Sequence, residues 1–302
     1  MTGRARRAWL LNFDAEDELA APTGYTPKRA VAARFAALTA RVVALLGPGD
    51  VVLGEGVPAS GLLGRAWCPT PRAVRAWTSA GVVAPQTPPL SVLQRVNHRR
   101  FAAELGQTLP DSRFVHAMDE LESVLAGPSP TGQFLLKRPF GFAGRGRRKV
   151  RSGGVEAAAR SWVEASFAGR SGERDGAGLQ VEPWVEIERE HGLHGFLSRA
   201  GALTLGEATT QTLDEAGAWI ATERAPRGAL EPAERDALFA SAEAAARALQ
   251  LAGYFGPFGV DAFRWRDARG ERCFQPRSEI NARYSMGWAI GMGDRRPDLD
   301  DD

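Results

Sequence analysis

Lysine, histidine and cysteine are scarce in this sequence. The 302 residues include three lysines, four histidines and two cysteines, and arginine supplies nearly all of the positive charge. Two cysteines are too few for a disulfide framework, so the chain fits a reducing cytosol and we expect a cytoplasmic protein. The histidines show no metal-ligand spacing, and surface or packing roles are expected for them. Because lysines are so few, a lysine on a predicted buried strand is a candidate for a functional role.

The chain also lacks a long apolar run, an internal repeat and a strong charge imbalance. No stretch of 18 apolar residues is present, which excludes a membrane span. The short apolar run near the N-terminus meets four acids and does not read as a signal peptide. A net charge of +2 indicates neither nucleic acid nor a membrane as a partner. Hydrophobic content of 44% and charged content of 25% are typical of a globular protein.

The first 92 residues predict a small α/β domain. Trp9–Asp14 is an apolar run typical of a buried strand. A helix is predicted from Pro27 to Leu45, because apolar residues recur there with helical spacing. The remaining predicted elements are strands at Val51–Leu53 and Val82–Val83 and a helix at Pro71–Ser79. Strand–helix–strand units of this kind favour a parallel sheet.

Acidic residues mark two places in the chain. Four lie at the end of the first predicted strand or just after it, namely Asp14, Glu16, Asp17 and Glu18. They form either a ligand-facing cluster at a strand end or a solvated loop and helix start, and the sequence leaves both open. Residues 294–302 form an acidic tail, and we expect its end, Asp298–Asp302, to be frayed.

A lysine stands on a strand-like segment in the middle of the chain. Gln133–Val150 predicts a strand that carries Lys137 and runs into a loop with three glycines, Gly141, Gly144 and Gly146. A lysine on a buried strand is costly unless an anion pairs with it. Glycines let backbone N–H groups close on phosphate oxygens. The loop is not a Walker A sequence, and a plain surface hairpin is the alternative.

The next strand, Leu179–Val185, ends in Glu-Pro-Trp-Val. A proline near the end of a strand leaves backbone groups free of the ladder. Free N–H and C=O groups are what the edge of an adenine ring requires. Glu190 follows a few residues later, after an expected short loop.

The most informative stretch is Gly259–Arg283. It predicts a hairpin that brings Asp261, Glu279 and Asn281 together, and oxygen ligands of this kind suit Mg²⁺. Arg283 follows two residues later, where a planar cation could brace a phosphate. Pro276 cannot donate to the ladder, so we expect a break or bulge there. Without the other segments, this hairpin would equally be a surface β-turn.

In their order and spacing these segments resemble the ATP-grasp superfamily. The resemblance covers about residues 95–293 and rests on the Lys137 strand with its glycine loop, the Glu182–Val185 hinge, Glu190 and the Gly259–Arg283 hairpin. It implies a mixed α+β and α/β fold in which two α+β subdomains grip ATP. The ATP-grasp domain would span 93–293, with a flap subdomain at about 127–182. The parallel-sheet domain at 1–92 would be the small domain that precedes it in such enzymes.

The resemblance also implies which residues hold the nucleoside. Lys137 would contact the α-phosphate and lie against the adenine. Glu182 would accept the adenine amino group, and Val185 would meet the ring through its backbone. Trp184, between them, is assigned to the same nucleotide site, with core packing as the alternative. Glu190 would hold the ribose hydroxyls.

At the phosphate end, the resemblance implies a flap, a metal site and a catalytic arginine. Gly144 and Gly146 would belong to the flap loop over the β- and γ-phosphates. Two Mg²⁺ ions, with Mn²⁺ as a substitute, would be bound by three residues, Asp261, Glu279 and Asn281. Arg283 would stabilise the transferring phosphoryl group and the acyl phosphate, and Lys137 would assist it.

One departure from the family pattern concerns a second phosphate-binding lysine. The helix predicted at Leu93–Leu105 has no lysine where the family usually carries one. Arg99 or Arg100 could replace it, because a guanidinium also donates to phosphate. Two surface arginines are the alternative.

The implied chemistry is ATP-dependent ligation of a carboxylate to an amine, giving an amide, ADP and phosphate. The substrates would be small molecules, with an amino acid or short peptide as the default, and a homodimer fits the resemblance. A nucleotide-binding regulatory or degenerate relative without turnover is one alternative. A kinase built on the same fold is another.

Overall fold

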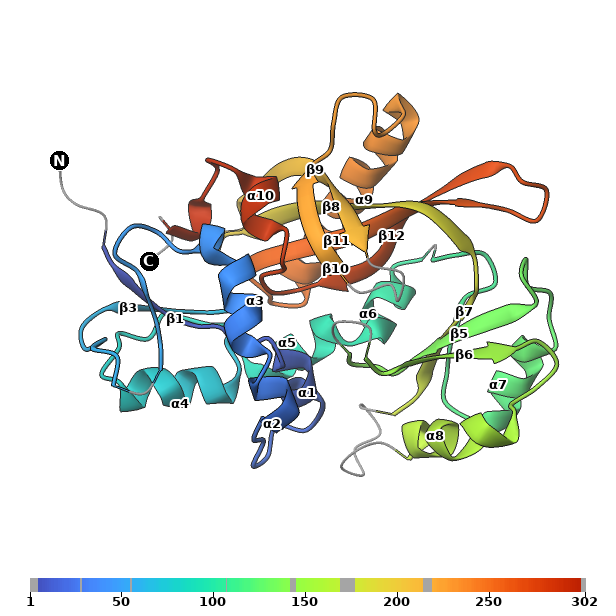
Figure 1. The fold of residues 1–302 in the computed structure, drawn as a ribbon, viewed down its shortest axis with the longest axis horizontal. Helices are drawn as coiled ribbons and strands as arrows, with labels where there is room; N and C mark the ends of the chain where they lie inside the picture. The colour runs from blue at the N-terminus through green and yellow to red at the C-terminus, as the bar shows by residue number, and fades with distance from the viewer. Residues whose placement is uncertain are drawn as a thin grey trace.

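A computed structural model describes residues 5–27, 29–54, 56–106, 108–141, 145–168, 177–213 and 219–299. Its strands form three sheets (Figure 1). A three-stranded parallel sheet lies at one end of the molecule and a four-stranded antiparallel sheet at the other (Figure 1). A five-stranded antiparallel sheet lies between them. None of the helices in these ranges has the length and apolar character needed to span a bilayer.

The N-terminal sheet has the order β2-β1-β3 and is parallel, as predicted. Its strands are β1 (Arg7–Leu10), β2 (Val51–Val52) and β3 (Leu63–Ala66). Its helices are α1 (Ala15–Ala20), α2 (Arg29–Ala32), α3 (Phe35–Arg41), the 3-10 turn η1 (Val43–Leu45) and α4 (Pro71–Ser79). The helix α4 has the predicted bounds, and the indole of Trp77 on it is fully buried.

Three details of this domain differ from the sequence prediction. β1 ends at Leu10, because the following residues turn into α1. The predicted 27–45 helix is broken into α2, α3 and η1. The third strand is β3, and Val83 makes only an isolated bridge to Leu63. Pro85 follows two residues later without an N–H, so the bridge does not extend into a strand.

The four-stranded sheet has the order β4-β7-β5-β6. Its strands are β4 (Arg113–Val115), β5 (Gln133–Lys137), β6 (Arg147–Arg151) and β7 (Leu179–Pro183). The helices α7 (Met118–Leu125) and α8 (Ala157–Phe167) accompany it. Phe134, Leu136 and Val181 point to the helices and form a separate small core with them. The alternate residues, Lys137 and Glu182 among them, therefore lie on the opposite face.

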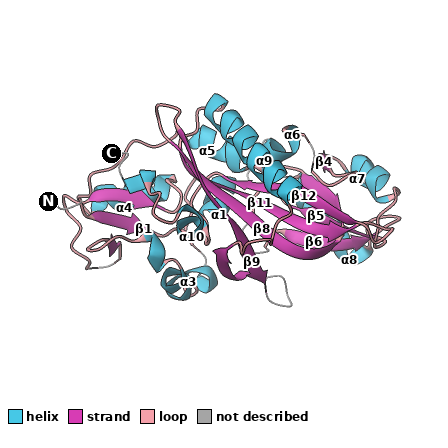
Figure 2. Ribbon diagram, turned by 90° about the horizontal axis from the view of Figure 1, so that it is seen from above, coloured by secondary structure: helices cyan, strands magenta, loops and turns pink. Residues whose placement is uncertain are grey.

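The five-stranded sheet has the order β10-β9-β8-β11-β12. Its strands are β8 (Glu186–Leu197), β9 (Leu203–Leu213), β10 (Trp219–Arg224), β11 (Gly256–Arg266) and β12 (Arg272–Asn281). No strand was predicted from the sequence at β10. The associated helices are α5 (Leu90–Asn97), α6 (Arg99–Glu104), α9 (Pro232–Leu251), α10 (Trp288–Met292) and the 3-10 turn η3 (Pro297–Leu299). Figure 2 shows α9 lying along β11 and β12.

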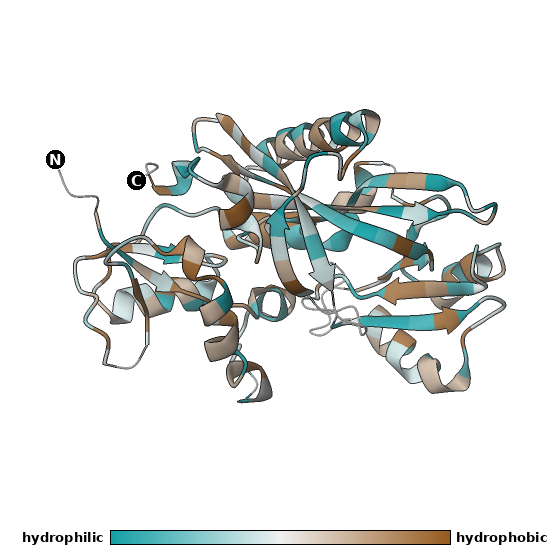
Figure 3. Cartoon of the chain, turned by 45° about the horizontal axis from the view of Figure 1, so that its top comes forward, coloured by the Kyte–Doolittle hydropathy of each residue, from teal (hydrophilic) through white to brown (hydrophobic). Residues whose placement is uncertain are grey.

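Apolar and polar residues alternate along these strands (Figure 3). Leu193, Val260 and Ile280 pair across β8, β11 and β12 and belong to the main core. Because the side-chain period of a strand is two, their neighbours point to the other face. Those neighbours include Asp261 and Glu279, which pair directly. The predicted bulge at Pro276 is confirmed, because Asp261 pairs with Glu279 while Phe263 pairs with Gln275.

The helix predicted at 93–105 is divided at His98 into α5 and α6. His98 has extended backbone angles, and its Nδ1 accepts a hydrogen bond from the Arg100 N–H at 3.1 Å. His98 thus caps the N-terminus of α6. Because α6 starts anew after His98, its residues do not continue the helical spacing of α5. The break therefore determines the directions in which Arg99 and Arg100 point.

The expectation of a frayed end is wrong for the first residues of that segment. Asp298 and Leu299 are buried, and Asp298 accepts a hydrogen bond from the Tyr284 hydroxyl at 2.9 Å. Asp298 also pairs with Arg296 at 2.8 Å. Residues 300–302 lie outside the described residues.

The buried His194 predicts an acid-sensitive stability. It lies on β8 with 3% of its surface exposed, and burial lowers its pKa to about 4. Below about pH 6.5 the unfolded chain binds a proton that the folded chain does not, so folding loses about 1.4 kcal/mol per pH unit. We expect His194→Gln to remove about 2 kcal/mol of the stability loss between pH 6.5 and 5, measured by urea unfolding. The exposed His116→Gln is the control, and an unchanged pH dependence in His194→Gln would contradict the prediction.

Candidate active site

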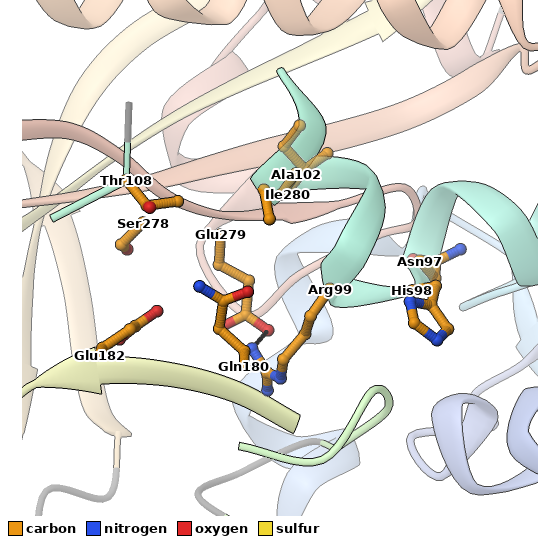
Figure 4. Close-up of a pocket in the computed structure, with 11 residues that line it drawn as sticks. Asn97, His98, Arg99, Ala102, Thr108, Gln180, Glu182, Ser278, Glu279 and Ile280 are labelled. Atoms are coloured by element: carbon orange, nitrogen blue, oxygen red, sulfur yellow. Dashed lines mark hydrogen bonds and ion pairs between the residues drawn. The ribbon is translucent and has the colours of Figure 1, made fainter. Parts of the chain in front are cut away.

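The four-stranded sheet and the five-stranded sheet, called the central sheet from here on, face each other across a pocket (Figure 4). The residues that line it come from α5, α6, β7 and β12 and the segments next to them. They are Asn97, His98, Arg99, Ala102, Ala103, Thr108, Gln180, Glu182, Ser278, Glu279 and Ile280. Three of the residues singled out from the sequence, Arg99, Glu182 and Glu279, are therefore brought to one cavity.

Asp261 and Glu279 form the acidic end of the site. The Asn281 amide donates to Asp261 Oδ2 at 2.8 Å, and the Gln211 amide donates to Asp261 Oδ1 at 3.1 Å. Burial, and then the Glu279 carboxylate, raise the pKa of Asp261 to about 6. The arrangement therefore holds two carboxylates close together at a cost that a bound cation would relieve. Gln211 was missed from the sequence, since nothing nearby marks it.

The donor set fits Mg²⁺ better than a transition metal. In the described ranges no group of three or more His, Cys, Asp or Glu side chains is arranged to hold a metal. Two carboxylates and one amide oxygen leave room for water and phosphate oxygens, as Mg²⁺ requires. The Asn281 oxygen, however, accepts a hydrogen bond from Arg283 at 2.9 Å. It would have to exchange that partner to bind a cation.

Arg99 lies beside Glu279, while Arg100 does not reach the site. Arg99 Nη1 is 2.5 Å from Glu279 Oε1, and its Nε donates to the Arg138 carbonyl. Arg100 pairs with Glu104 on the exposed side of α6. Burial alone would raise the pKa of Glu279, but Arg99, Lys137 and Arg283 together hold it below its usual value. The break at His98 thus turns Arg99, and not Arg100, toward the acids.

Lys137 and Glu182 form the other end of the site. Lys137 Nζ is 2.7 Å from Glu182 Oε2 across neighbouring strands, so the half-buried lysine has an anion partner. Val185 packs against Phe263 and Trp265 from the central sheet. The two sheets therefore meet at the hinge that follows Glu182.

The hinge differs from the expectation in its backbone. The Trp184 N–H donates to the Gln133 carbonyl at 2.8 Å, and its C=O accepts from the Thr131 hydroxyl at 2.8 Å. Both backbone groups of Trp184 are thus hydrogen-bonded within the protein. Its indole lies 4.1 Å from Lys149 Nζ. The free-backbone expectation is wrong for Trp184.

Glu190 lies on β8, in the middle of a long strand and not after a short loop. Burial, and then the nearby Asp261, raise the pKa of Glu190 to about 7. It stands directly opposite Gln211 on β9 and Phe263 on β11. Glu190 therefore lies on the same face of the central sheet as Asp261 and Glu279.

The glycine loop is only partly described. Gly144 lies outside the described residues. A Cβ on Gly141 would come within 2.5 Å of the Arg145 carbonyl oxygen, so only glycine fits there. Gly146 has φ of +70°, a conformation that other residues rarely adopt. Glycine is therefore required by space at Gly141 and favoured by backbone conformation at Gly146 in the loop between β5 and β6.

Arg283 is buried and held by the N-terminal domain. Its Nε donates to Glu16 Oε1 at 2.6 Å, and its Nη2 contacts the same oxygen. Glu16 is 4% exposed, and burial raises its pKa against the opposing effect of Arg283. Sequence reasoning gave Glu16 no partner, because the two residues are 267 positions apart.

The other acids after β1 are buried as well. Asp14 accepts a hydrogen bond from the Tyr25 hydroxyl at 2.8 Å and pairs with Arg72. Glu18 accepts from the Thr70 hydroxyl at 2.6 Å. The solvated-loop alternative is therefore wrong for Asp14, Glu16 and Glu18. Asp14 and Glu18 share Arg72 as their partner, and Glu16 pairs with Arg283.

The fold is similar to several solved structures at low sequence identity. Biotin carboxylase from Campylobacter jejuni, solved as a β-γ-ATP complex, has a TM-score of 0.56 at 13% identity, over 94% of this chain and 71% of that one. The biotin carboxylase domain of 2-oxoglutarate carboxylase from Hydrogenobacter thermophilus has a TM-score of 0.54 at 15% identity, over 96% and 70%. N5-carboxyaminoimidazole synthase from Aspergillus clavatus has a TM-score of 0.52 at 14% identity, over 98% and 77%.

No protein-family model matches the sequence, and neither does any curated protein. The three structural neighbours share the ATP-grasp fold. This chain therefore has the ATP-grasp fold, with a small parallel-sheet domain before it, as the resemblance predicted.

Proposed function

We propose that this protein is an ATP-dependent ligase that activates a carboxylate as an acyl phosphate and transfers the acyl group to an amine. The observation that carries the proposal is that the two ends of the cleft hold different charged groups. A lysine–glutamate pair lies at one end, Lys137 with Glu182. A pair of carboxylates with a guanidinium lies at the other, Asp261 and Glu279 with Arg99. A nucleoside triphosphate also has two different ends, a base at one and anionic phosphates at the other.

In the proposed complex the base lies at the Lys137–Glu182 end. Glu182 accepts the adenine amino group, Val185 meets the ring, Lys137 contacts the α-phosphate and Glu190 holds the ribose. Two of the neighbouring structures support a nucleotide site in this fold, since one was solved as a β-γ-ATP complex and another with MgADP, ADP and bicarbonate. Trp184 would contact the nucleotide through its ring alone, because its backbone N–H and C=O are hydrogen-bonded to Gln133 and Thr131.

Asp261, Glu279 and Asn281 would hold Mg²⁺, which supplies charge neutralisation at the β- and γ-phosphates. Lys137 and Arg99 place two further cations at the phosphates. Phosphoryl transfer depends mostly on positioning and charge stabilisation, so this equipment suits it. The flap, including Gly144 and Gly146, would exclude water from the reacting groups.

The proposed reaction has two transfers. An oxygen of the substrate carboxylate attacks the γ-phosphorus, and the bond from that phosphorus to the ADP oxygen breaks. The amine nitrogen then attacks the acyl carbon, phosphate leaves with the bonding electrons, and the amine releases a proton. Arg283 would stabilise the phosphoryl group in both transfers. It can do so only after giving up part of its contact with Glu16 and Asn281.

That engagement of Arg283 favours one alternative, a nucleotide-binding protein without ligase turnover. A guanidinium that stays bound to Glu16 cannot reach a phosphate. The two proposals are separated by measuring ADP and phosphate release against a panel of amines with amino acids, short peptides and bicarbonate as carboxylates. ATP binding without release of ADP and phosphate for any pair would overturn the ligase proposal.

We also propose a homodimer, as one neighbouring structure is a dimer, and light scattering tests it.

Arg99 and Arg100 form a matched pair for testing the phosphate end. We expect Arg99→Met to weaken ATP binding about tenfold or more, since a hydrogen bond to a charged group contributes about 1.5–3 kcal/mol. Arg100→Met removes the same charge from the exposed side of α6 and should leave the affinity unchanged. Isothermal titration with Mg-ATP measures both. Equal losses in the two variants would show that Arg99 has no specific role.

A further inference from the structure

Gln180 carries a buried carboxamide that no described residue satisfies. It lies on β7 and is 3% exposed. Neither Nε2 nor Oε1 has a hydrogen-bond partner among the described residues. Burying an amide without partners is costly, and such groups in folded proteins call for an explanation. A ligand that supplies both partners is the simplest one.

The side chain is directed into the pocket. Gln180 lies directly opposite Lys137 across the ladder and two residues before Glu182, so all three share one face of the sheet. Figure 4 shows its carboxamide projecting from β7 toward Glu279 and Arg99. Arg99 does not satisfy it, because its donors go to Glu279 and to the Arg138 and Gly141 carbonyls.

We propose that Gln180 recognises the N6–N7 edge of adenine and thereby selects ATP over GTP. The inference rests on the proposed function, since it needs a nucleotide in this cleft. The carboxamide offers a donor beside an acceptor, and its ligand must do the same in reverse. A phosphate presents acceptors only and would leave Oε1 unpaired. Adenine presents the N6 amino donor next to the N7 acceptor, and a glutamine matches this pair with two hydrogen bonds.

The order of residues along the strand agrees with this assignment. Gln180 and Glu182 lie two residues apart on one face of β7, with Gln180 on the side of Glu279 and Arg99, and Val185 follows them where the two sheets meet. On the base, N7, the N6 amino group and N1 follow one another in the same direction along the edge. Gln180 thus takes N7 and one amino hydrogen, and Glu182 takes the other. Guanine presents O6 and N7, two acceptors, and one carboxamide cannot donate to both while keeping its oxygen paired.

The test compares ATP with 7-deaza-ATP, in which a carbon replaces N7. Wild type should bind 7-deaza-ATP roughly fivefold to tenfold more weakly than ATP, the effect of one lost hydrogen bond. Gln180→Met keeps the length of the side chain without its polar atoms and should bind the two nucleotides equally. It should also bind ATP about tenfold more weakly than wild type and discriminate less against GTP. The exposed Gln250→Met on α9 is the matched control and should behave as wild type.

The outcomes separate this inference from the proposed function. If wild type binds ATP and 7-deaza-ATP equally, Gln180 does not contact N7 and the inference is overturned, whether or not the variant folds. An equal preference for ATP in wild type and Gln180→Met overturns it too, because the discrimination then arises elsewhere. In both cases the nucleotide site stands. Failure of wild type to bind any nucleotide overturns both proposals together.

Discussion

Replacing Glu279 with alanine is expected to abolish the Mg²⁺ dependence of ATP binding and to slow nucleotide turnover by about a hundredfold or more. The substitution removes one of the two carboxylates that pair across β11 and β12, and it leaves Arg99 without its acid. A loss of this size is typical when one group that stabilises developing charge is removed. Titration of ATP at several Mg²⁺ concentrations, together with ADP release, measures both effects.

Glu104→Ala is the matched control for that experiment. Glu104 is an acid on α6 that pairs with Arg100 on the exposed side of the helix, so the charge change is equal and the site is untouched. Glu279→Gln separates charge from shape, because an amide oxygen still accepts from Arg99 while the second negative charge is lost. Mg²⁺-dependent ATP binding that survives in Glu279→Ala would mean that the metal site is placed wrongly.

Replacing Glu16 with alanine is expected to destabilise the protein by about 3–5 kcal/mol. Among the described residues, the substitution leaves the buried Arg283 guanidinium with hydrogen bonds to the Asn281 and Tyr284 oxygens, and Glu279 is the remaining carboxylate that acts on its pKa. An uncompensated buried charge costs far more than a surface pair, and total stabilities are about 5–15 kcal/mol. Urea unfolding of the two proteins at pH 7 gives the difference.

Two further variants distinguish the buried pair from a general loss of packing. Glu156→Ala removes an acid from an exposed pair with Arg151 and should change stability by less than about 1 kcal/mol. The double variant Glu16→Leu with Arg283→Met removes both charges and should regain most of the lost stability, since apolar residues can replace a buried ion pair. It should not regain turnover. A Glu16→Ala variant as stable as wild type would show that the pair does not hold the two domains together.

Elements that depend on nearby residues were predicted well from the sequence. The strand that carries Lys137, the hairpin of β11 and β12, the bulge at Pro276 and the helix α4 follow from local apolar spacing and from proline chemistry. Elements that depend on distant partners were not. Val83 forms only a bridge, and β10 exists because β9 offers it an edge. Asp298 is ordered because it meets the Tyr284 hydroxyl, which no local pattern announces.

The sequence by itself determined the order of the segments that resemble the ATP-grasp superfamily, because strand alternation and turn chemistry act over a few residues. That order predicted the fold. Only the tertiary structure decided which side chains meet. Arg99 faces the acids because His98 divides the helix, and Glu16 reaches Arg283 from a different domain. Gln180 is left unpaired in a pocket whose walls come from separate sheets. These contacts join residues far apart in the chain, and packing of the whole molecule, not local preference, brings them together.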